Sequence, residues 1–376
     1  MLHPRPTSFL AGLALCLTAA LATAAETVKL EKTVTGTPEV KSINTIRFGP
    51  GGVPFIGDGA GKQVLAVETG GEACKAGFTQ PVDGIKKKIA ERLGATEKEI
   101  EIGALAVHPV THVAHVVVRK PGKAIIATID GDGKIGECTL ENVKYIKINL
   151  PVEKNFSRVT DVAWGGDRLL ISGASNEEFG AKIFSVPAPL TNDAKATVSS
   201  AETFHVAHNK WETRAPMYTL LPFEEEGKKY IAGSFVCTPV VKYPLDNLKD
   251  GEKVKGTSMV ELGHGNQPIG MITYEKDGKT YILMNNIRRF HARQPIGPSP
   301  YWAVRFERNL LMGKDNVNQK ALWRVKKGTV EPTSDQFKVL EDYHGVMLMD
   351  KLDGGRALTI KDDGKGNQTL VALALP

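Results

Sequence analysis

The stretch TIRFGPGGVPFIGDGAGKQVLAV at residues 45–67 contains three short apolar segments separated by turns rich in Gly, Pro and Asp. The segments at 45–48, 53–57 and 63–67 carry β-branched and aromatic residues, which favours three consecutive β-strands. A similar unit recurs five more times along the chain. The first strands of the six units are expected at Thr45–Phe48, Ala104–Val107, Asp161–Trp164, Leu220–Phe223, Met271–Tyr274 and Val346–Met349.

This repeat predicts a β-propeller. The second residues of the six first strands, at positions 46, 105, 162, 221, 272 and 347, lie 59, 57, 59, 51 and 75 positions apart, which is typical of propeller blades. A blade buries both faces only against neighbouring blades, so the units must close into a ring. We therefore expect an all-β fold, a single six-bladed β-propeller. The last unit ends after three strands, and Thr27–Val34 is expected to supply the N-terminal strand that closes this last blade.

The first 25 residues have the form of a secretory signal peptide, with a basic start at Arg5, an apolar run and small residues before the expected cleavage site. A lipid anchor at Cys16 is the competing interpretation, but Leu15 is bulky where a lipobox prefers a small residue. The propeller domain is then 26–376, in a periplasmic or secreted protein. No later apolar run approaches the roughly 20 residues that a membrane-spanning helix needs.

Charge and cysteine content exclude several classes. The formal net charge of +6 is spread through polar turns without a run of five or six like charges, which argues against a nucleic-acid-binding arm. Outside the signal, Cys74, Cys138 and Cys237 allow at most one intramolecular disulfide, whose pairing the sequence leaves open. Two insertions interrupt the repeat: a short amphipathic helix at about 83–94 and a long basic loop at about 287–300 in the fifth blade.

Residues 45–58 followed by 63–68 resemble blades of the broad SMP-30/gluconolactonase and NHL type of six-bladed propeller. With 175–179, 212–216 and 265–271, the mature chain also resembles a group of uncharacterised exported bacterial propeller proteins. Lactonases of the first type hold a divalent metal, usually calcium, with a Glu at the start of the opening blade and Asn, Asn and Asp from other blades. This chain has Asn44 at that Glu position, so the resemblance transfers no metal ligand.

The propeller geometry predicts where a site could form. Loops before the first strand of each blade, and loops between the second and third strands, lie on one face of the ring and surround one mouth. His108, His112 and His115 belong to the opposite face and are expected to be surface or core histidines. The candidate ligand-binding residues at the mouth are Asn44, Asp58, Arg158, Glu212, Arg214, Asn266, Gln267, Asn285, Asn286, Arg288 and His344.

Two classes of function are compatible with this mouth. The first is a binding module for a protein, glycan or small anionic ligand, because exposed Arg, aromatic and amide groups suffice for it. The alternative is a metal-dependent or acid-base hydrolase of lactonase type, so the sequence leaves open whether the protein is an enzyme. A divalent metal would be its candidate cofactor. The candidate metal ligands are His208, Glu212, His264 and His344.

For acid-base hydrolysis without a metal, Glu212, Asp161 or a histidine would serve as the base, and Arg158 or Arg214 would stabilise the developing anion. The sequence contains no G-x-S-x-G motif that would indicate a nucleophilic serine.

Overall fold

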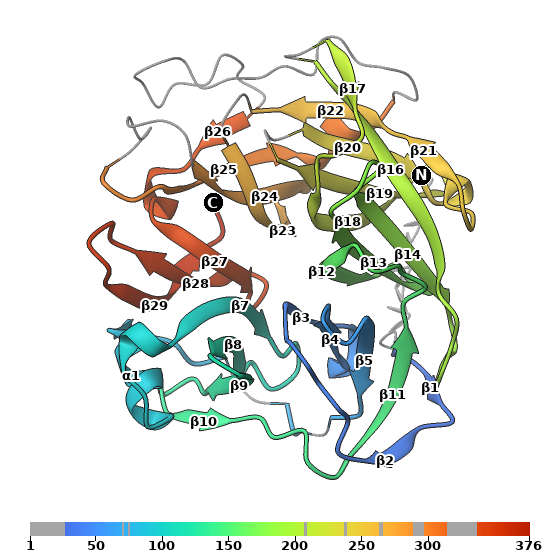
Figure 1. Ribbon diagram of the computed structural model, residues 1–376. Helices are drawn as coiled ribbons and strands as arrows, with labels where there is room; N and C mark the ends of the chain where they lie inside the picture. The colour runs from blue at the N-terminus through green and yellow to red at the C-terminus, as the bar shows by residue number, and fades with distance from the viewer. Residues whose placement is uncertain are drawn as a thin grey trace, which may run out of the picture.

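Six antiparallel sheets surround a common axis in the computed structural model of the protein (Figure 1). The chain is therefore a six-bladed β-propeller, as its repeat predicts. The structure describes residues 27–69, 71–73, 76–206, 209–236, 239–262, 266–288, 297–313 and 337–376.

The blades are numbered in chain order, and their strands are given from the axis outward. Blade one contains β3 (Thr45–Phe48), β4 (Pro54–Asp58), β5 (Gln63–Val67), β11 (Val143–Asn149) and β2 (Val34–Gly36). Blade two contains β7 (Glu101–Val107), β8 (Ala114–Lys120), β9 (Lys123–Ile129) and β10 (Ile135–Glu137). Blade three contains β12 (Phe156–Trp164), β13 (Arg168–Ser175), β14 (Ala181–Pro187), β16 (Thr197–His205) and β17 (Lys210–Glu212), with β21 (Lys253–Lys255) beside β16.

The second half of the chain forms the other three blades. Blade four contains β18 (Met217–Glu225), β19 (Lys228–Phe235), β20 (Pro239–Pro244) and β22 (Thr257–Glu261). Blade five contains β23 (Asn266–Lys276), β24 (Lys279–Arg288), β25 (Tyr301–Glu307) and β26 (Phe337–Val339). Blade six contains β27 (Val346–Lys351), β28 (Arg356–Asp362), β29 (Gln368–Ala374) and β6 (Val82–Asp83). Each predicted first strand lies within the innermost strand of its blade.

The blades do not follow one another around the ring in chain order. The inner strand β3 of blade one lies between β7 of blade two and β12 of blade three, and β7 in turn lies next to β27 of blade six (Figure 1). The order around the axis is therefore two, one, three, four, five, six. Blades one and two have thus exchanged places relative to their order in the chain. Two strands lie on the segments that connect the exchanged blades: β6 joins blade six before the chain enters blade two, and β11 joins blade one after the chain leaves blade two.

The predicted closing strand of the last blade is wrong. Residues 27–34 do not complete the last blade, because β1 (Leu30–Glu31) pairs in parallel with β15 (Leu190–Thr191) and β2 pairs with β11. Blade six is completed by β6, which pairs antiparallel with β29. The physical reason is proximity: blade two is the neighbour of blade six, so the chain passes along the edge of blade six on its way into blade two.

Apolar side chains fill the spaces between neighbouring blades. In β5, Leu65 packs towards blade two, whereas Val64 and Ala66 pack towards blade three. Because successive side chains of a strand point to opposite faces, a strand with a blade on each side is apolar at every position. This explains the near-continuous apolar segments of the repeat.

The insertion before blade two contains α1 (Ile85–Arg92), whose Ile85 and Ile89 are fully buried in the core shared by blades two and six. Single turns of 3-10 helix lie at Pro50–Gly52, Glu97–Glu99, Leu245–Asn247, Arg308–Leu311 and Glu341–Tyr343. None of the helices in the described ranges is long and apolar enough to cross a membrane. Cys138 is a half-buried free thiol, while Cys74, Cys237 and the predicted signal peptide lie outside the described residues.

Candidate functional site

The axis of the propeller holds two cavities that meet at one side chain, Arg47 of β3. The wide cavity, of about 750 Å³, lies at the ends of the inner strands and is lined by the turns that follow them. The narrow cavity, of about 80 Å³, lies at the beginnings of the inner strands, which is the end of the predicted mouth. Arg47 lines both cavities, so it separates the two ends of the channel.

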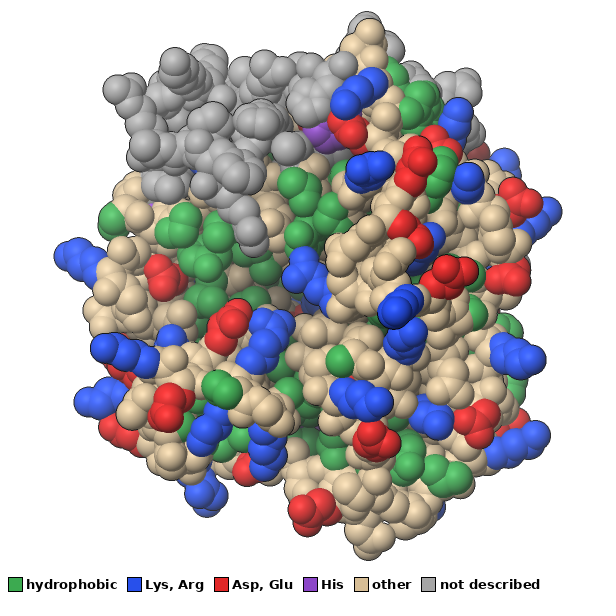
Figure 2. Space-filling model, in the orientation of Figure 1, with side chains coloured by type: hydrophobic (Ala, Val, Ile, Leu, Met, Phe, Trp, Pro, Cys, Tyr) green, Lys and Arg blue, Asp and Glu red, His purple; other side chains and the backbone are tan. Residues whose placement is uncertain are grey.

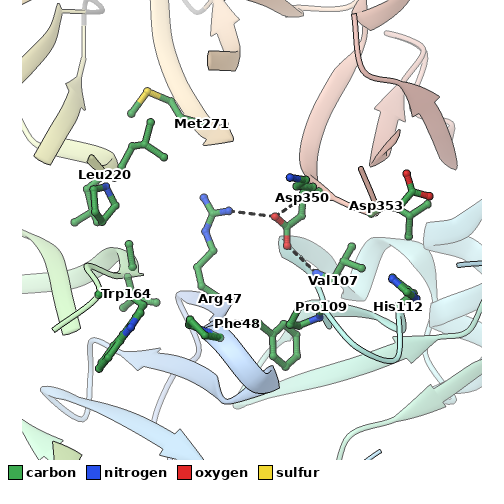
Figure 3. A pocket seen from close by; sticks show the side chains of 18 of the residues that line it. Arg47, Phe48, Val107, Pro109, His112, Trp164, Leu220, Met271, Asp350 and Asp353 are labelled. Carbon is green, nitrogen blue, oxygen red and sulfur yellow. Dashed lines mark hydrogen bonds and ion pairs between the residues drawn. The ribbon is translucent and has the colours of Figure 1, made fainter. Parts of the chain in front are cut away.

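Arg47 is held by two aspartates from other blades. Its Nε donates to Oδ1 of Asp161 at 3.1 Å and its Nη2 donates to Oδ2 at 3.5 Å. Its Nη1 lies 3.7 Å from Oδ1 of Asp350, an ion pair beyond hydrogen-bond distance (Figure 3). Blades one, three and six are therefore joined at the axis by one guanidinium group.

Asp161 is saturated by donors from the protein. Its Oδ1 also accepts from the backbone N–H of Val162 at 2.9 Å. Its Oδ2 accepts from the hydroxyl of Thr219 at 2.7 Å and from the N–H of Leu220 at 3.1 Å. With a side chain only 4% exposed, Asp161 ties blade four to the centre and lines only the narrow cavity.

Asp350 is bonded differently and lines the wide cavity. Its Oδ2 accepts from the N–H of Val107 at 2.8 Å, and its Oδ1 accepts from the N–H of Lys351 at 2.9 Å. Its side chain is 17% exposed, which leaves part of the carboxylate open to the wide cavity. Figure 3 shows Asp350 beside the guanidinium of Arg47, which projects between the apolar walls.

The charges of this cluster do not cancel, because one guanidinium faces two carboxylates. Burial by itself would lower the pKa of Arg47, but the charges of Asp161 and Asp350 outweigh it and raise that pKa above its ordinary value. Burial raises the pKa of Asp350 above its ordinary value, and the charge of Arg47 with two backbone hydrogen bonds offsets this only in part. The centre of the channel therefore holds an excess of buried negative charge.

The walls of the wide cavity are mostly apolar. Leu220 lies across Arg47 from Asp350, and Met271, Trp164 and Phe48 also line the cavity (Figure 3). The apolar side chains lining the cavity are Phe48, Pro50, Val107, Pro109, Val162, Ala163, Trp164, Leu220, Leu221, Pro222, Met271 and Leu352. His112, Lys351 and Asp353 add polar groups, and Asp353 is paired with Arg356 at 2.8 Å.

Two buried histidines pack against Phe48 at the wide end of the channel. The rings of His108 and His115 each lie 4.9 Å from the Phe48 ring, measured between centroids. Burial lowers the pKa of both imidazoles, that of His115 to about 4, and His112 lowers that of His108 further. Gly52, at a φ of 88°, leaves room for His108, because a side chain at that position would collide with the imidazole. The sequence left open whether these histidines are surface or core residues; His108 and His115 are buried, while His112 reaches the wide cavity.

The narrow end is shaped by β-bulges. In every blade except blade one, the pairing of the inner strand shifts near its beginning; in blades two, four, five and six the extra residues are Gly103, Tyr218, Ile269 and Met347. In blade three the pairing shifts twice, at Ser157 and Thr160. Bulges bend a strand and re-aim its side chains. Gly103, Thr160 and Ile269 accordingly line the narrow cavity.

The structure brings two of the candidate ligand-binding residues, Asn44 and Asn285, and the candidate base Asp161 to the narrow cavity. Oδ1 of Asn44 accepts from the N–H of Gly59 at 2.9 Å. Nδ2 of Asn285 donates to the carbonyls of Val346 at 3.2 Å and Met347 at 3.0 Å, which links blade five to blade six. Oδ1 of Asn285 is buried without a hydrogen-bond partner among the described residues.

Asp58 is fully buried and engaged by the protein itself. Its carboxylate accepts from the backbone N–H groups of Lys41, Ser42 and Gly61 at 2.8–2.9 Å. Side-chain donors from Ser42 and Gln63 complete the set. This role in holding the segment before β3 accounts for Asp58 without a ligand.

Three further candidates lie away from both cavities. Arg158 is exposed and donates through Nη2 to the hydroxyl of Tyr218 at 3.0 Å. Oε1 of Glu212 lies 3.2 Å from Nζ of Lys210, and Arg214 is exposed. On the face drawn in Figure 2, basic and acidic side chains are interspersed rather than gathered by sign.

The candidates of blade five are mostly buried within its sheet. Asn266, Gln267 and Asn286 are buried, and Nδ2 of Asn286 donates to the carbonyl of Met284 at 3.4 Å. Burial lowers the pKa of Arg288 at the end of β24. It also lowers the pKa of His344, with a further contribution from Lys361.

The metal hypothesis falls partly outside the described residues, where His208 and His264 lie. Within the described ranges no three His, Cys, Asp or Glu side chains come together as a group that would hold a metal ion. A metal site at the mouth therefore stays a prediction.

Sequence reasoning did not propose Arg47 and Asp350 as site residues, although it named Asp161 as a candidate base. A signal was present: each interrupts an apolar innermost strand, in TIRF at 45–48 and in VMLMD at 346–350. Charged residues are rarely buried unless they are paired. Two unlike charges in inner strands of different blades would therefore have indicated a pair at the axis.

Comparison with known proteins assigns no family to the chain. No protein-family model and no curated protein sequence matches the chain. A chain of the mitotic checkpoint complex is similar over 100% of this chain and 99% of its own, at 10% identity and a TM-score of 0.38. A protein from Bacteroides fragilis described as exported covers 92% of this chain and 95% of its own, at 7% identity and a TM-score of 0.28. For streptogramin B lyase the coverage is 90% and 97%, the identity 10% and the TM-score 0.21.

Proposed function

We propose that this protein is exported and binds a small organic ligand in the wide cavity. The observation that carries the proposal is a cavity of about 750 Å³ whose apolar walls surround the charged pair of Arg47 and Asp350. Sites for small molecules typically have volumes of about 300–1,000 Å³, apolar walls and a few convergent polar groups. The predicted signal peptide at residues 1–25 would place the protein in the periplasm or outside the cell, where it would meet such a ligand.

This proposal keeps the binding hypothesis but moves it from the predicted mouth to the other end of the channel. The narrow cavity, at about 80 Å³, has room for only a few waters or a very small group. The polar groups there mostly bond to neighbouring backbone, as Asn44 and Asn285 do. The wide cavity has both the volume and the exposed apolar surface that a ligand would bury.

The experiment is a fluorescence titration of the mature protein with N-phenyl-1-naphthylamine, a neutral apolar probe whose emission rises in an apolar site. Two half-buried alanines of inner strands form a matched pair: Ala163 lines the wide cavity and Ala104 lines the narrow one. Ala163→Phe is expected to weaken probe binding at least about tenfold, about 1.4 kcal/mol, and Ala104→Phe to change it less than about twofold.

Thermal unfolding of both variants controls for misfolding. Equal binding by Ala163→Phe and wild type, or equal loss in both variants, would place the probe elsewhere and contradict the proposal.

One observation favours hydrolysis as a second candidate function. Asp350 lies beside Arg47, and a carboxyl group whose pKa is raised by burial next to an anion-stabilising cation is a pair that acid-base hydrolysis uses. The test is opening of δ-valerolactone followed in a pH-stat. Turnover by wild type that disappears in Asp350→Asn would support this candidate, and identical rates for the two proteins would remove it.

A further inference from the structure

The two aspartates that share Arg47 differ in how much of their hydrogen-bonding capacity the protein uses. Asp161 receives two bonds from the guanidinium, two from backbone N–H groups and one from the Thr219 hydroxyl. Asp350 receives two bonds, both from backbone N–H groups, and its distance of 3.7 Å to Nη1 of Arg47 is too long for a third. An ionised carboxylate has about four acceptor positions. Asp350 therefore has acceptor capacity left on the side of the wide cavity.

The charge balance indicates what would use this capacity. Arg47 supplies one positive charge against two carboxylates, all within an axial cluster that is 4–20% exposed. The other acid lining the cavity, Asp353, is already paired with Arg356. An anionic ligand at the floor would add a third negative charge to the cluster. A cation would neutralise the excess, and attraction between opposite charges is strong where water is largely excluded.

The walls suit the same kind of ligand. Trp164 and Phe48 offer aromatic faces, and Met271 offers a polarisable thioether that adapts to apolar groups of varied shape. Aromatic faces attract cations and also pack against apolar groups. The wide cavity thus combines an acidic floor with walls that accept an apolar body.

We propose that the ligand of the wide cavity carries a positively charged nitrogen group on an apolar body, and that this group pairs with Asp350. The inference rests on the proposed function, because it names the ligand class of the same cavity. The raised pKa of Asp350 is consistent with it, since burial outweighs the charge of Arg47 at 3.7 Å and a second positive partner on the cavity side would favour the ionised carboxylate. Lys351 is exposed at the rim and does not supply that partner within ion-pair distance among the described residues.

The test compares three probes that share a phenylethyl body: 2-phenylethylamine, which is cationic, 2-phenylethanol, which is neutral, and 3-phenylpropionate, which is anionic. Each competes with N-phenyl-1-naphthylamine for the mature protein at pH 7. We expect the amine to bind at least about tenfold more tightly than the alcohol, and the carboxylate to bind most weakly. In Asp350→Asn, the amine and the alcohol should bind within about twofold of each other, because the charge that separates them is gone.

Asp353→Asn is the matched control, since it removes a carboxylate from the same blade that already has a partner. This variant should retain the preference for the amine. A carboxylate that binds best, an amine that binds no better than the alcohol, or an unchanged preference in Asp350→Asn overturns the inference. Because probe binding itself is measured with the naphthylamine, these outcomes leave the proposed function standing, whereas loss of all probe binding defeats both. Should Asp350→Asn fail to fold, the wild-type series alone decides.

Discussion

The two ends of the axial channel are built from the same six inner strands, yet they have opposite characters. At the wide end the strands run into tight turns, and side chains such as Leu220 and Met271 are left facing a cavity. At the narrow end five of the six inner strands carry bulges, and groups such as Asn285 bond across to the next blade. In this propeller, amide side chains join neighbouring blades at the narrow end, whereas apolar side chains face a cavity at the wide end.

Replacing Arg47, which separates the two ends of the channel, should cause the largest loss of unfolding free energy. Arg47→Met leaves Asp161 and Asp350 buried without their cation, and breaking such a buried pair typically costs about 3–5 kcal/mol. Urea denaturation should show this loss of unfolding free energy. Arg47→Lys keeps the charge and should lose less. A Met variant as stable as wild type would mean that the cluster does not hold the blades together.

Lowering the pH should reduce the stability of the wide end before that of the narrow end. The pKa of His115 is about 4 in the fold and about 6.5 when unfolded, so the unfolded chain binds more protons between these values. The stability contributed by neutral His115 is full above pH 6.5 and is lost as the pH falls towards 4, by up to about 3 kcal/mol.

Hydrogen exchange at pH 5 and pH 7 measures the difference, and β8 should lose protection more than β24, whose Asn285 does not titrate. His115→Gln should flatten the dependence. Equal losses in the two strands would contradict the contrast between the ends.

Substitution of the two aspartates should give a smaller difference in unfolding free energy. Asp161→Asn disturbs five hydrogen bonds in a nearly inaccessible position, whereas Asp350→Asn disturbs two beside a cavity. Leaving a buried donor unsatisfied costs about 1–3 kcal/mol, so Asp161→Asn is expected to be the less stable variant by about that amount. Thermal or urea unfolding of the two isosteric variants decides, and the reverse order would show that Asp350 is the structural member of the pair.

The smallest effect is expected on the rim of the narrow end. Arg158 is exposed, and its contact with Tyr218 is a single hydrogen bond with a ring 5.3 Å away. Arg158→Ala should change the unfolding free energy by no more than about 1 kcal/mol. It should also leave binding in the wide cavity unchanged, as the probe titration can measure. A marked loss of probe binding would indicate that Arg158 takes part in ligand binding.

The strands of this fold were predictable because their pattern is local. Each apolar segment of the repeat needs only its own residues to indicate a strand, and all six innermost strands lie where the repeat places them. The exchange of blades one and two was not predictable in this way. It depends on which blade faces which, and strands such as β3 and β7 are apolar whichever neighbour covers them.

The site was less accessible to sequence reasoning than the fold. Loop polarity directed attention to residues such as Asp58 and Asn286, which the structure shows buried and bonded to nearby backbone. Arg47 and Asp350 are just over three hundred positions apart in the chain and meet only once the ring is closed. Bulges at Gly103 or Ile269 depend on pairing register, which the residue types alone do not specify.

The exchanged order of the blades also determines when the ring can be completed. Blade six obtains its outer strand from Val82–Asp83, residues that leave the ribosome long before β29 does. Until Thr369 and Leu370 arrive to pair with them, β6 has no partner strand, and Asp83 lacks its bond to the Thr369 hydroxyl. β6 is therefore synthesised early, although its partner β29 is the last strand of the chain to be made. A chain truncated before Gln368 would retain β6 but lack the strand with which it pairs.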